Sequence, residues 1–240
     1  MIWDDTKIVA ADLETSGKLP EYALQPWRMA RGDAWITSGS MMRADADRGF
    51  VPVLSQLFPT KAQLMAAVQH AVDNDLTILG WNIAFDIGML MALGPDMEDL
   101  CIRAKLLDGM LMWRHYDIEP EYEFQTAKHL KRSYALKPAA MGTWLPHVPA
   151  YNEDVDFHAT DAASLARLQA YNDKDNVYTF CIAKMIWARL TERQRAAVLV
   201  EAECLRRKTL PSIAFGFKTC SQKWKRQPIE KFIGDRPHTM

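Results

Sequence analysis

The chain has few cysteines, and their positions do not suit a metal site or a disulfide framework. Cys101, Cys181, Cys204 and Cys220 lie far apart, with no CxxC pair and no histidine at ligand spacing. This pattern argues against a structural zinc site and against a disulfide-rich secreted fold. We expect free, buried thiols.

Long apolar runs and a signal peptide are also missing. No stretch approaches the roughly 18 apolar residues of a membrane span. The first residues, MIWDDTKIVA, have neither a basic region nor a small-residue cleavage site. We therefore expect a cytoplasmic protein with no membrane partner. The 240 residues, of which 49% are hydrophobic, are enough to bury the core of one α/β domain.

The net charge of the whole chain is close to zero, but its two parts carry large charges of opposite sign. The net charge is −1, yet residues 205–240 hold nine basic and two acidic residues, so they carry +7 and residues 1–204 carry −8. A basic tail on an acidic body could hold a polyanion near a metal site made of carboxylates. A solvated chain end has the same composition. We divide the chain into a domain, 1–204, and a basic tail, 205–240.

Apolar patterning in the first quarter of the chain predicts strands. Ile8–Ala11 is typical of a buried strand and would place Asp12 at its carboxyl end, where ligands often collect. Arg31-Gly32-Asp33, between mixed apolar residues, indicates a hairpin within 27–40. A third strand is expected over 50–54 despite its proline. These elements predict an early antiparallel meander.

Helix signals follow. Thr60 and Gln63 form the capping box of a helix with a clear apolar face. Asp108 is expected to be a turn or capping residue. The other expected elements are a strand over 77–79, a short helix that stops at Gly94-Pro95, a helix after Gly109, and one long or two abutting helices over 161–190.

Asp12 and Glu14 are the first candidate site residues. They flank Leu13, and the alternation of a strand turns both carboxylates to one side. Two acids on one side repel each other unless a cation neutralises them, and Mg²⁺ or Mn²⁺ prefers carboxylate and water ligands. Alone, a D-x-E pattern is much more often a solvated pair than a metal site.

Two further polar pairs follow along the chain. Asn82 and Asp86 lie in GWNIAFD, beside the expected end of a strand. Tyr171 and Asp175 are spaced i, i+4 and share one helix face, from which Asp173 points away. Each pair has a plain structural explanation: a first-turn acid favoured by the helix dipole, or a half-buried tyrosine beside a surface acid.

Together, the order D-x-E, N-x-x-x-D, Y-x-x-x-D resembles the DEDDy 3′→5′ exonucleases, most closely the proofreading domain of family A DNA polymerases. The matching segments are AADLETSG, GWNIAFD and LQAYNDKD, and the resemblance covers about Ile8 to Leu205. Trp81 stands where family members often have histidine. The tyrosine four residues before Asp175 indicates the tyrosine branch, because Ala170 stands where the histidine branch needs histidine.

The resemblance implies an α/β, ribonuclease H-like exonuclease fold with a central mixed five-stranded sheet flanked by helices. It implies removal of nucleoside monophosphates from DNA 3′ ends with two divalent metal ions, Mg²⁺ or Mn²⁺. By the same resemblance, Asp12, Glu14, Asp86 and Asp175 hold the metals, Tyr171 orients the attacking water, and Thr15 and Asn82 contact the terminal nucleotides.

The connecting segments LLDGMLMWRHY and SYALKPAAMGTWLP also resemble this family, and LTERQRAAVLVEAECL looks like the helix that leads into its polymerase domain. Residues 205–240 are too few for a polymerase domain. The expected partner is a single-stranded DNA 3′ end in a bacterial or phage-infected cell, with or without a separately encoded DNA polymerase.

Two alternatives stay open. One is an RNA-trimming exonuclease of the ribonuclease D type, which shares the motifs. The other is an inactive nucleic-acid-binding module. Its tail would grip nucleic acid by charge and stacking through Lys223, Trp224, Lys225 and Arg226.

Overall fold

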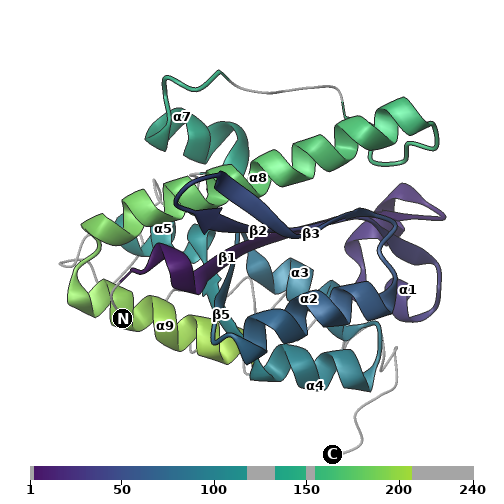
Figure 1. The fold of residues 1–240 in the computed structure, drawn as a ribbon, viewed down its shortest axis with the longest axis horizontal. Helices are drawn as coiled ribbons and strands as arrows, with labels where there is room; N and C mark the ends of the chain where they lie inside the picture. The colour runs from purple at the N-terminus through teal and green to yellow at the C-terminus, as the bar shows by residue number, and fades with distance from the viewer. Residues whose placement is uncertain (1–2, 118–132, 150–154, 207–240) are drawn as a thin grey trace, which may run out of the picture.

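The computed structural model describes residues 3–117, 133–149 and 155–206. The strands in this part of the chain are β1 (Ile8–Gly17), β2 (Ala34–Asp45), β3 (Gly49–Leu57), β4 (Thr77–Gly80) and β5 (Lys105–Asp108). They form one sheet in the order β3-β2-β1-β4-β5 (Figure 1). β1, β2 and β3 pair antiparallel, whereas β1, β4 and β5 pair parallel. The expected α/β class and mixed five-stranded sheet are confirmed.

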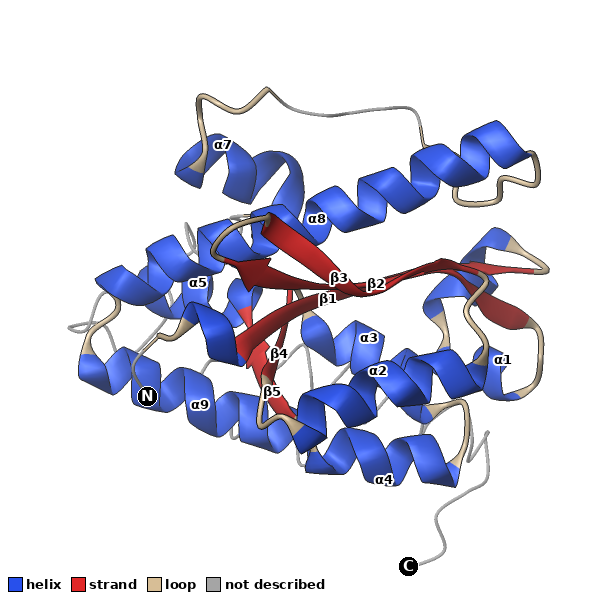
Figure 2. Cartoon of the chain, viewed as in Figure 1, coloured by secondary structure: helices blue, strands red, loops and turns tan. Residues whose placement is uncertain are grey.

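Helices cover both faces of the sheet. The helices described are α1 (Pro26–Ala30), α2 (Lys61–Asp73), α3 (Ile83–Met91), α4 (Pro95–Arg103), α5 (Gly109–Asp117), α7 (Met141–Trp144), α8 (Ala162–Arg189) and α9 (Glu192–Arg206), with short turns η1 (Asp5–Lys7), η2 (Pro20–Leu24) and η3 (Leu136–Ala140). One apolar core lies between the sheet and α1 to α4, and a second lies between the sheet and α5, α7, α8 and α9. Figure 2 shows α8 across one face, with α2, α3 and α4 on the other.

β1 separates the two cores and sets the direction of the candidate acids. Val9 and Leu13 belong to the core of α1 to α4, whereas Ile8 and Ala10 belong to the core of α8. Strand alternation therefore places Asp12 on the α8 face.

The expected end of this first strand was wrong, because β1 continues to Gly17 instead of ending before Asp12. Its parallel pairing with β4 stops at Ala10, but its antiparallel pairing with β2 continues to the end. Asp12 therefore lies just beyond the last residue paired with β4, at the edge where parallel strands present ligand sites.

The hairpin expected over 27–40 was also wrong. Pro26 begins the short helix α1, since proline suits a first helical position, and Gly32 follows that helix with φ 71°. The hairpin lies further along, where β2 turns into β3 before Gly49. β3 extends past both ends of the expected strand 50–54, and it tolerates Pro52 as the edge strand of the sheet.

The helices that local sequence signals predict are confirmed. Thr60 caps α2 through the complete capping box with Gln63. α3 carries Asp86 in its first turn, and the region 161–190 forms a single helix, α8. α4 and β5 were not expected, because α4 buries only three apolar side chains and β5 has only four residues.

α9 packs on β5 and α5. Gln194 donates a hydrogen bond to the carbonyl of His115, and Glu201 lies beside the same histidine. α9 ends at Arg206, two residues beyond the expected domain boundary. In the part of the chain that is described, no helix has the length and apolar character needed to cross a membrane.

Three of the cysteines lie in the described ranges. Cys101 is buried, whereas Cys181 and Cys204 are only partly buried, and all three are free thiols. The expectation of free thiols is confirmed for these residues, and that of full burial only for Cys101. Cys220 and the tail residues Lys223, Trp224, Lys225 and Arg226 lie outside the described residues.

Candidate functional site

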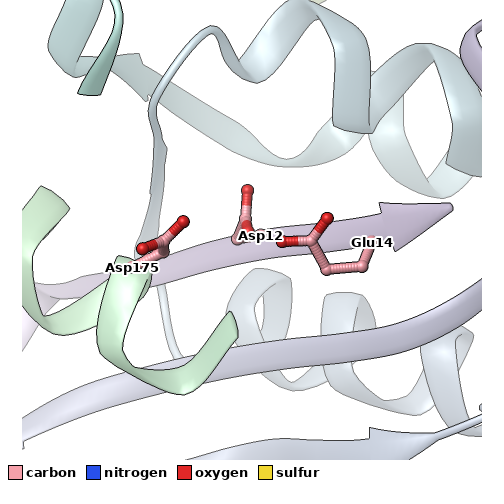
Figure 3. Close-up of side chains that lie close together, drawn as sticks. All are labelled: Asp12, Glu14 and Asp175. Carbon is pink, nitrogen blue, oxygen red and sulfur yellow. The ribbon is translucent and has the colours of Figure 1, made fainter. Parts of the chain in front are cut away.

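Three of the predicted carboxylates meet between β1 and α8. Asp12 and Glu14 come from β1 and are partly exposed, and Asp175 comes from α8 and is buried. One oxygen of each lies within 4.8 Å of the others. Figure 3 shows the carboxylate of Asp175 facing Asp12, with the side chain of Glu14 folded toward Asp12. We call these three residues the carboxylate cluster.

The donor atoms of the cluster fit a hard divalent cation. All three are carboxylate oxygens, without a thiolate or an imidazole, and this set suits Mg²⁺ or Mn²⁺ better than zinc or copper. Three acids at this distance repel one another, and a bound cation would remove that repulsion. The cluster could therefore bind a metal ion.

Asp86 lies beside the cluster without belonging to it. Its side chain is buried, and its Oδ1 accepts a hydrogen bond of 3.0 Å from the backbone N–H of Leu13. The pKa of the Asp86 carboxyl is raised well above its ordinary value, mainly because the group is buried and secondly because the charge of Asp12 is near. Asp86 therefore accepts a hydrogen bond from the backbone of β1 and also interacts electrostatically with Asp12 of the cluster.

Tyr171 lies one turn before Asp175 on α8 and is half-buried. Burial raises the pKa of its phenol above the ordinary value, and the charges of Asp175, Glu14 and Asp12 raise it further. The hydroxyl group therefore stays protonated at neutral pH. It can donate a hydrogen bond, but it cannot serve there as a general base.

The two predicted nucleotide contacts are placed differently. The Thr15 hydroxyl donates a hydrogen bond of 2.7 Å to the carbonyl of Ala23 and is buried. Asn82 is exposed and adopts a left-handed conformation, φ 65°, at the start of α3. Its backbone N–H donates to Asp108, a buried carboxylate that also accepts the N–H of Met110 as the expected turn residue. The side chain of Asn82 faces solvent, whereas that of Thr15 is directed into the protein.

Polar side chains hold α8 against β2. Asn172 donates a hydrogen bond to the hydroxyl of Ser38 at 2.9 Å, and Ser40 donates to Asp173 at 2.6 Å. Asp173 thus points away from the cluster, as expected. The residues of this α8–β2 seam are Ser38, Ser40, Ser55, Gln169, Asn172 and Asp173.

The seam fixes the position of the cluster. Ser40 lies opposite Asp12 in the antiparallel register, and Ser38 lies opposite Glu14. The serines that anchor α8 are therefore the direct neighbours of two cluster acids, and α8 carries the third, Asp175. Sequence reasoning missed the seam, because its partners are more than a hundred residues apart and no local pattern joins them.

Two hollows of the described surface lie away from the cluster. One, of about 460 Å³, is apolar and lies between α1 and α3 beside Trp27 and Met91. The other, of about 470 Å³, lies between β3 and α2 beside Pro52 and His70. Neither is lined by a cluster residue. The carboxylate cluster is therefore the better guide to the chemistry of the chain, since neither hollow contains a comparable group of charged side chains.

Comparison with known proteins adds no family assignment. No protein-family model matches the chain, and no curated protein matches it at a significant level.

Proposed function

We propose that the chain is a metal-dependent 3′→5′ exonuclease of the DEDDy type with a ribonuclease H-like fold, which removes nucleoside monophosphates from DNA 3′ ends. The observation that carries the proposal is the convergence of Asp12 and Glu14 from β1 with Asp175 from α8. Tyr171, one turn away, has the spacing of the tyrosine branch. The strand order β3-β2-β1-β4-β5 is compatible with this fold.

Under this proposal the cluster and Asp86 would hold two divalent ions, Mg²⁺ or Mn²⁺. When bound, such ions lower the pKa of a water molecule and offset the negative charge that develops on the phosphate. The raised pKa of Asp86 means that cation binding there displaces a proton. Metal affinity should therefore increase with pH through the range in which Asp86 titrates.

The residues around the cluster would orient the substrate. The protonated phenol of Tyr171 can donate a hydrogen bond to the attacking water or to a phosphate oxygen. Asn82, whose amide is exposed, is the better of the two candidates for contact with a terminal nucleotide, because the hydroxyl of Thr15 is engaged by Ala23. Water adds to the phosphorus of the last phosphodiester and loses a proton. The bond from this phosphorus to the 3′ oxygen of the preceding nucleotide breaks, that oxygen takes up a proton to become the new 3′ hydroxyl, and a nucleoside 5′-monophosphate leaves.

Cleavage of 5′-labelled single-stranded DNA tests the proposal. We expect the wild type to shorten the strand from its 3′ end with Mg²⁺ or Mn²⁺ and not with EDTA, and the Asp12→Ala, Glu14→Ala double variant to be inactive. An Asp47→Ala, Asp99→Ala variant removes the same charge at exposed positions and should remain active.

Three outcomes would contradict the proposal. Cleavage that survives in EDTA would exclude the metal dependence. Faster degradation of a matched RNA strand would favour the ribonuclease D type of enzyme. Tight DNA binding without any cleavage would indicate a binding module.

A further inference from the structure

The short segment before α8 contacts both elements that carry the cluster. His158 and Ser16 of β1 share a hydrogen bond of 2.6 Å between Nδ1 and Oγ. The preceding residue, Phe157, packs edge to face on the ring of Tyr171, with ring centroids 5.9 Å apart and an interplanar angle of 83°. Two consecutive side chains therefore connect β1 with the tyrosine of α8.

The two ends of this connection lie close to the cluster acids. Ser16 is 2% exposed and lies two residues after Glu14 on β1. Tyr171 lies four residues before Asp175 on α8. The segment is itself held by a turn in which Asp156 accepts the N–H of His158.

We propose that Phe157 and His158 are positioning residues that hold the Tyr171 hydroxyl toward the carboxylate cluster. The proposal rests on the nuclease function proposed above. An edge-to-face pair favours one orientation of the tyrosine ring. The hydrogen bond to Ser16 fixes the segment that supplies this pair, and its loss would take this partner from the buried Ser16 hydroxyl, although His158 itself is exposed.

A purely structural role for the segment makes a different prediction. If His158 only stabilised the fold, its removal would lower the melting temperature and leave the rate per folded molecule unchanged. If it acts through Tyr171, its removal must lower the rate in the wild type and have no further effect once the Tyr171 hydroxyl is gone.

The test compares His158→Ala, Ser16→Ala and Phe157→Ala, each with Tyr171 and with Tyr171→Phe. Rates are measured on 5′-labelled single-stranded DNA with Mn²⁺, well below the melting temperature. We expect each single variant to lower kcat on the order of tenfold with KM little changed. No further loss is expected in the Tyr171→Phe background.

Two substitutions serve as controls. His158→Asn should restore most of the rate, because its amide can reach Ser16. His147→Ala, which removes an exposed imidazole elsewhere, should behave as the wild type. Equal losses in both backgrounds, or wild-type kcat in folded His158→Ala, would overturn the proposal.

A second measurement does not depend on activity. In protein labelled with 3-fluorotyrosine, the ¹⁹F resonance of Tyr171 is assigned by its loss in Tyr171→Phe. His158→Ala and Ser16→Ala should shift or broaden this resonance, whereas His147→Ala should not. An unchanged resonance would refute the positioning role even if the wild type cleaved no DNA, and inactivity of the wild type alone would refute only the nuclease function.

Discussion

Tyr171 lies near several negatively charged side chains, and its surroundings determine whether its hydroxyl can lose a proton. Because burial, and then the charges of Asp175, Glu14 and Asp12, raise the pKa of the phenol, deprotonation is disfavoured throughout the neutral range. The group can thus contribute only a hydrogen bond, which when charge-assisted is worth about 1.5 to 3 kcal/mol.

We expect Tyr171→Phe to slow nucleotide release on the order of ten- to hundredfold without abolishing it, since the carboxylates remain. The measurement is the cleavage rate against pH for both proteins. The two profiles should be parallel, because the raised pKa of Tyr171 keeps its phenol protonated throughout the neutral range. Two results would show that the phenol transfers a proton. One is a Tyr171→Phe variant as inactive as Asp12→Ala, and the other is a cleavage rate whose rise or fall with pH disappears in Tyr171→Phe.

The buried carboxyl of Asp108 makes the free energy of unfolding depend on pH. Burial raises the pKa of its carboxyl to about 6, although the N–H groups of Asn82, Leu111 and Met110 donate to Oδ1 and oppose the shift. The folded state therefore holds this proton more tightly than the unfolded chain. Its contribution to the free energy of unfolding is full below pH 4 and falls by roughly 3 kcal/mol as the pH rises through 6.

In Asp108→Asn the side-chain oxygen can still accept the same three hydrogen bonds, but no proton titrates. Urea unfolding of both proteins between pH 4 and 7, in EDTA, should show that the wild type loses stability relative to the variant as pH rises. The pKa of Asp86 is raised in both proteins, so its contribution cancels except for the smallest of its causes, the charge of Asp108. Parallel stability curves would contradict the assignment.

The residues of the site differ in how far the sequence could predict them. Asp12 with Glu14, and Tyr171 with Asp175, are local pairs whose spacing fixes a shared side of a strand or helix. Their meeting depends on how α8 packs against β1, and only the family resemblance predicted it.

Contacts between distant parts of the chain could not be predicted from local spacing in the sequence. Leu13 and Asp86 are 73 residues apart, and Ser16 and His158 are 142 apart. No periodicity in either segment encodes such a partner.

At the scale of elements, α8 is held by polar contacts as well as by its apolar face. Asn172 is fully buried, and its Oδ1 has no hydrogen-bond partner in the described structure, so its amide depends on Ser38. Loss of that partner leaves a buried donor unsatisfied, which costs about 1 to 3 kcal/mol.

We therefore expect Ser38→Ala to lower the free energy of unfolding by about 1 to 3 kcal/mol and to weaken Mn²⁺ binding, because α8 positions Asp175. Ser55→Ala is the matched control. Ser55 belongs to the same seam but is exposed, so its loss should cost less than about 1 kcal/mol. Urea unfolding and calorimetric Mn²⁺ titration provide the measurements. Equal costs for the two variants would mean that the seam does not position the helix.

Element boundaries were predictable where a local signal is complete. The capping box at Thr60 predicts the start of α2, because two side chains satisfy the first backbone donors. The length of β1 was not predictable, since its second half depends on pairing with β2. The segment 27–31 was misread because the proline just before it, Pro26, is equally compatible with a turn and with the first residue of a helix.

At the scale of the whole molecule, charge is divided between an acidic body and a basic tail. Residues 1–204 carry −8 and residues 205–240 carry +7. If the body holds the cations of the reaction, the tail is the part best suited to attract the phosphates of the strand.

Replacing Lys223, Lys225 and Arg226 by serine in the full chain tests this division. In EDTA, the affinity for oligothymidylate should fall, and the slope of log affinity against log salt should decrease by about 2. Cleavage at saturating DNA should be unchanged. A control with Arg31, Arg103 and Arg193, all exposed on the body, replaced by serine should keep the slope. An unchanged slope in the tail variant would leave the tail without a role in DNA binding.

The hydrogen bond from Leu13 to Asp86 subjects one position to two selective pressures. Beyond Ala10, where β4 no longer pairs with β1, the Asp86 carboxylate serves the strand as its acceptor. If the proposed function holds, a lineage that lost it would still need an oxygen at position 86 to accept this hydrogen bond from β1. Among relatives of this chain, retention of Asp86 should therefore be a poor marker of an active enzyme.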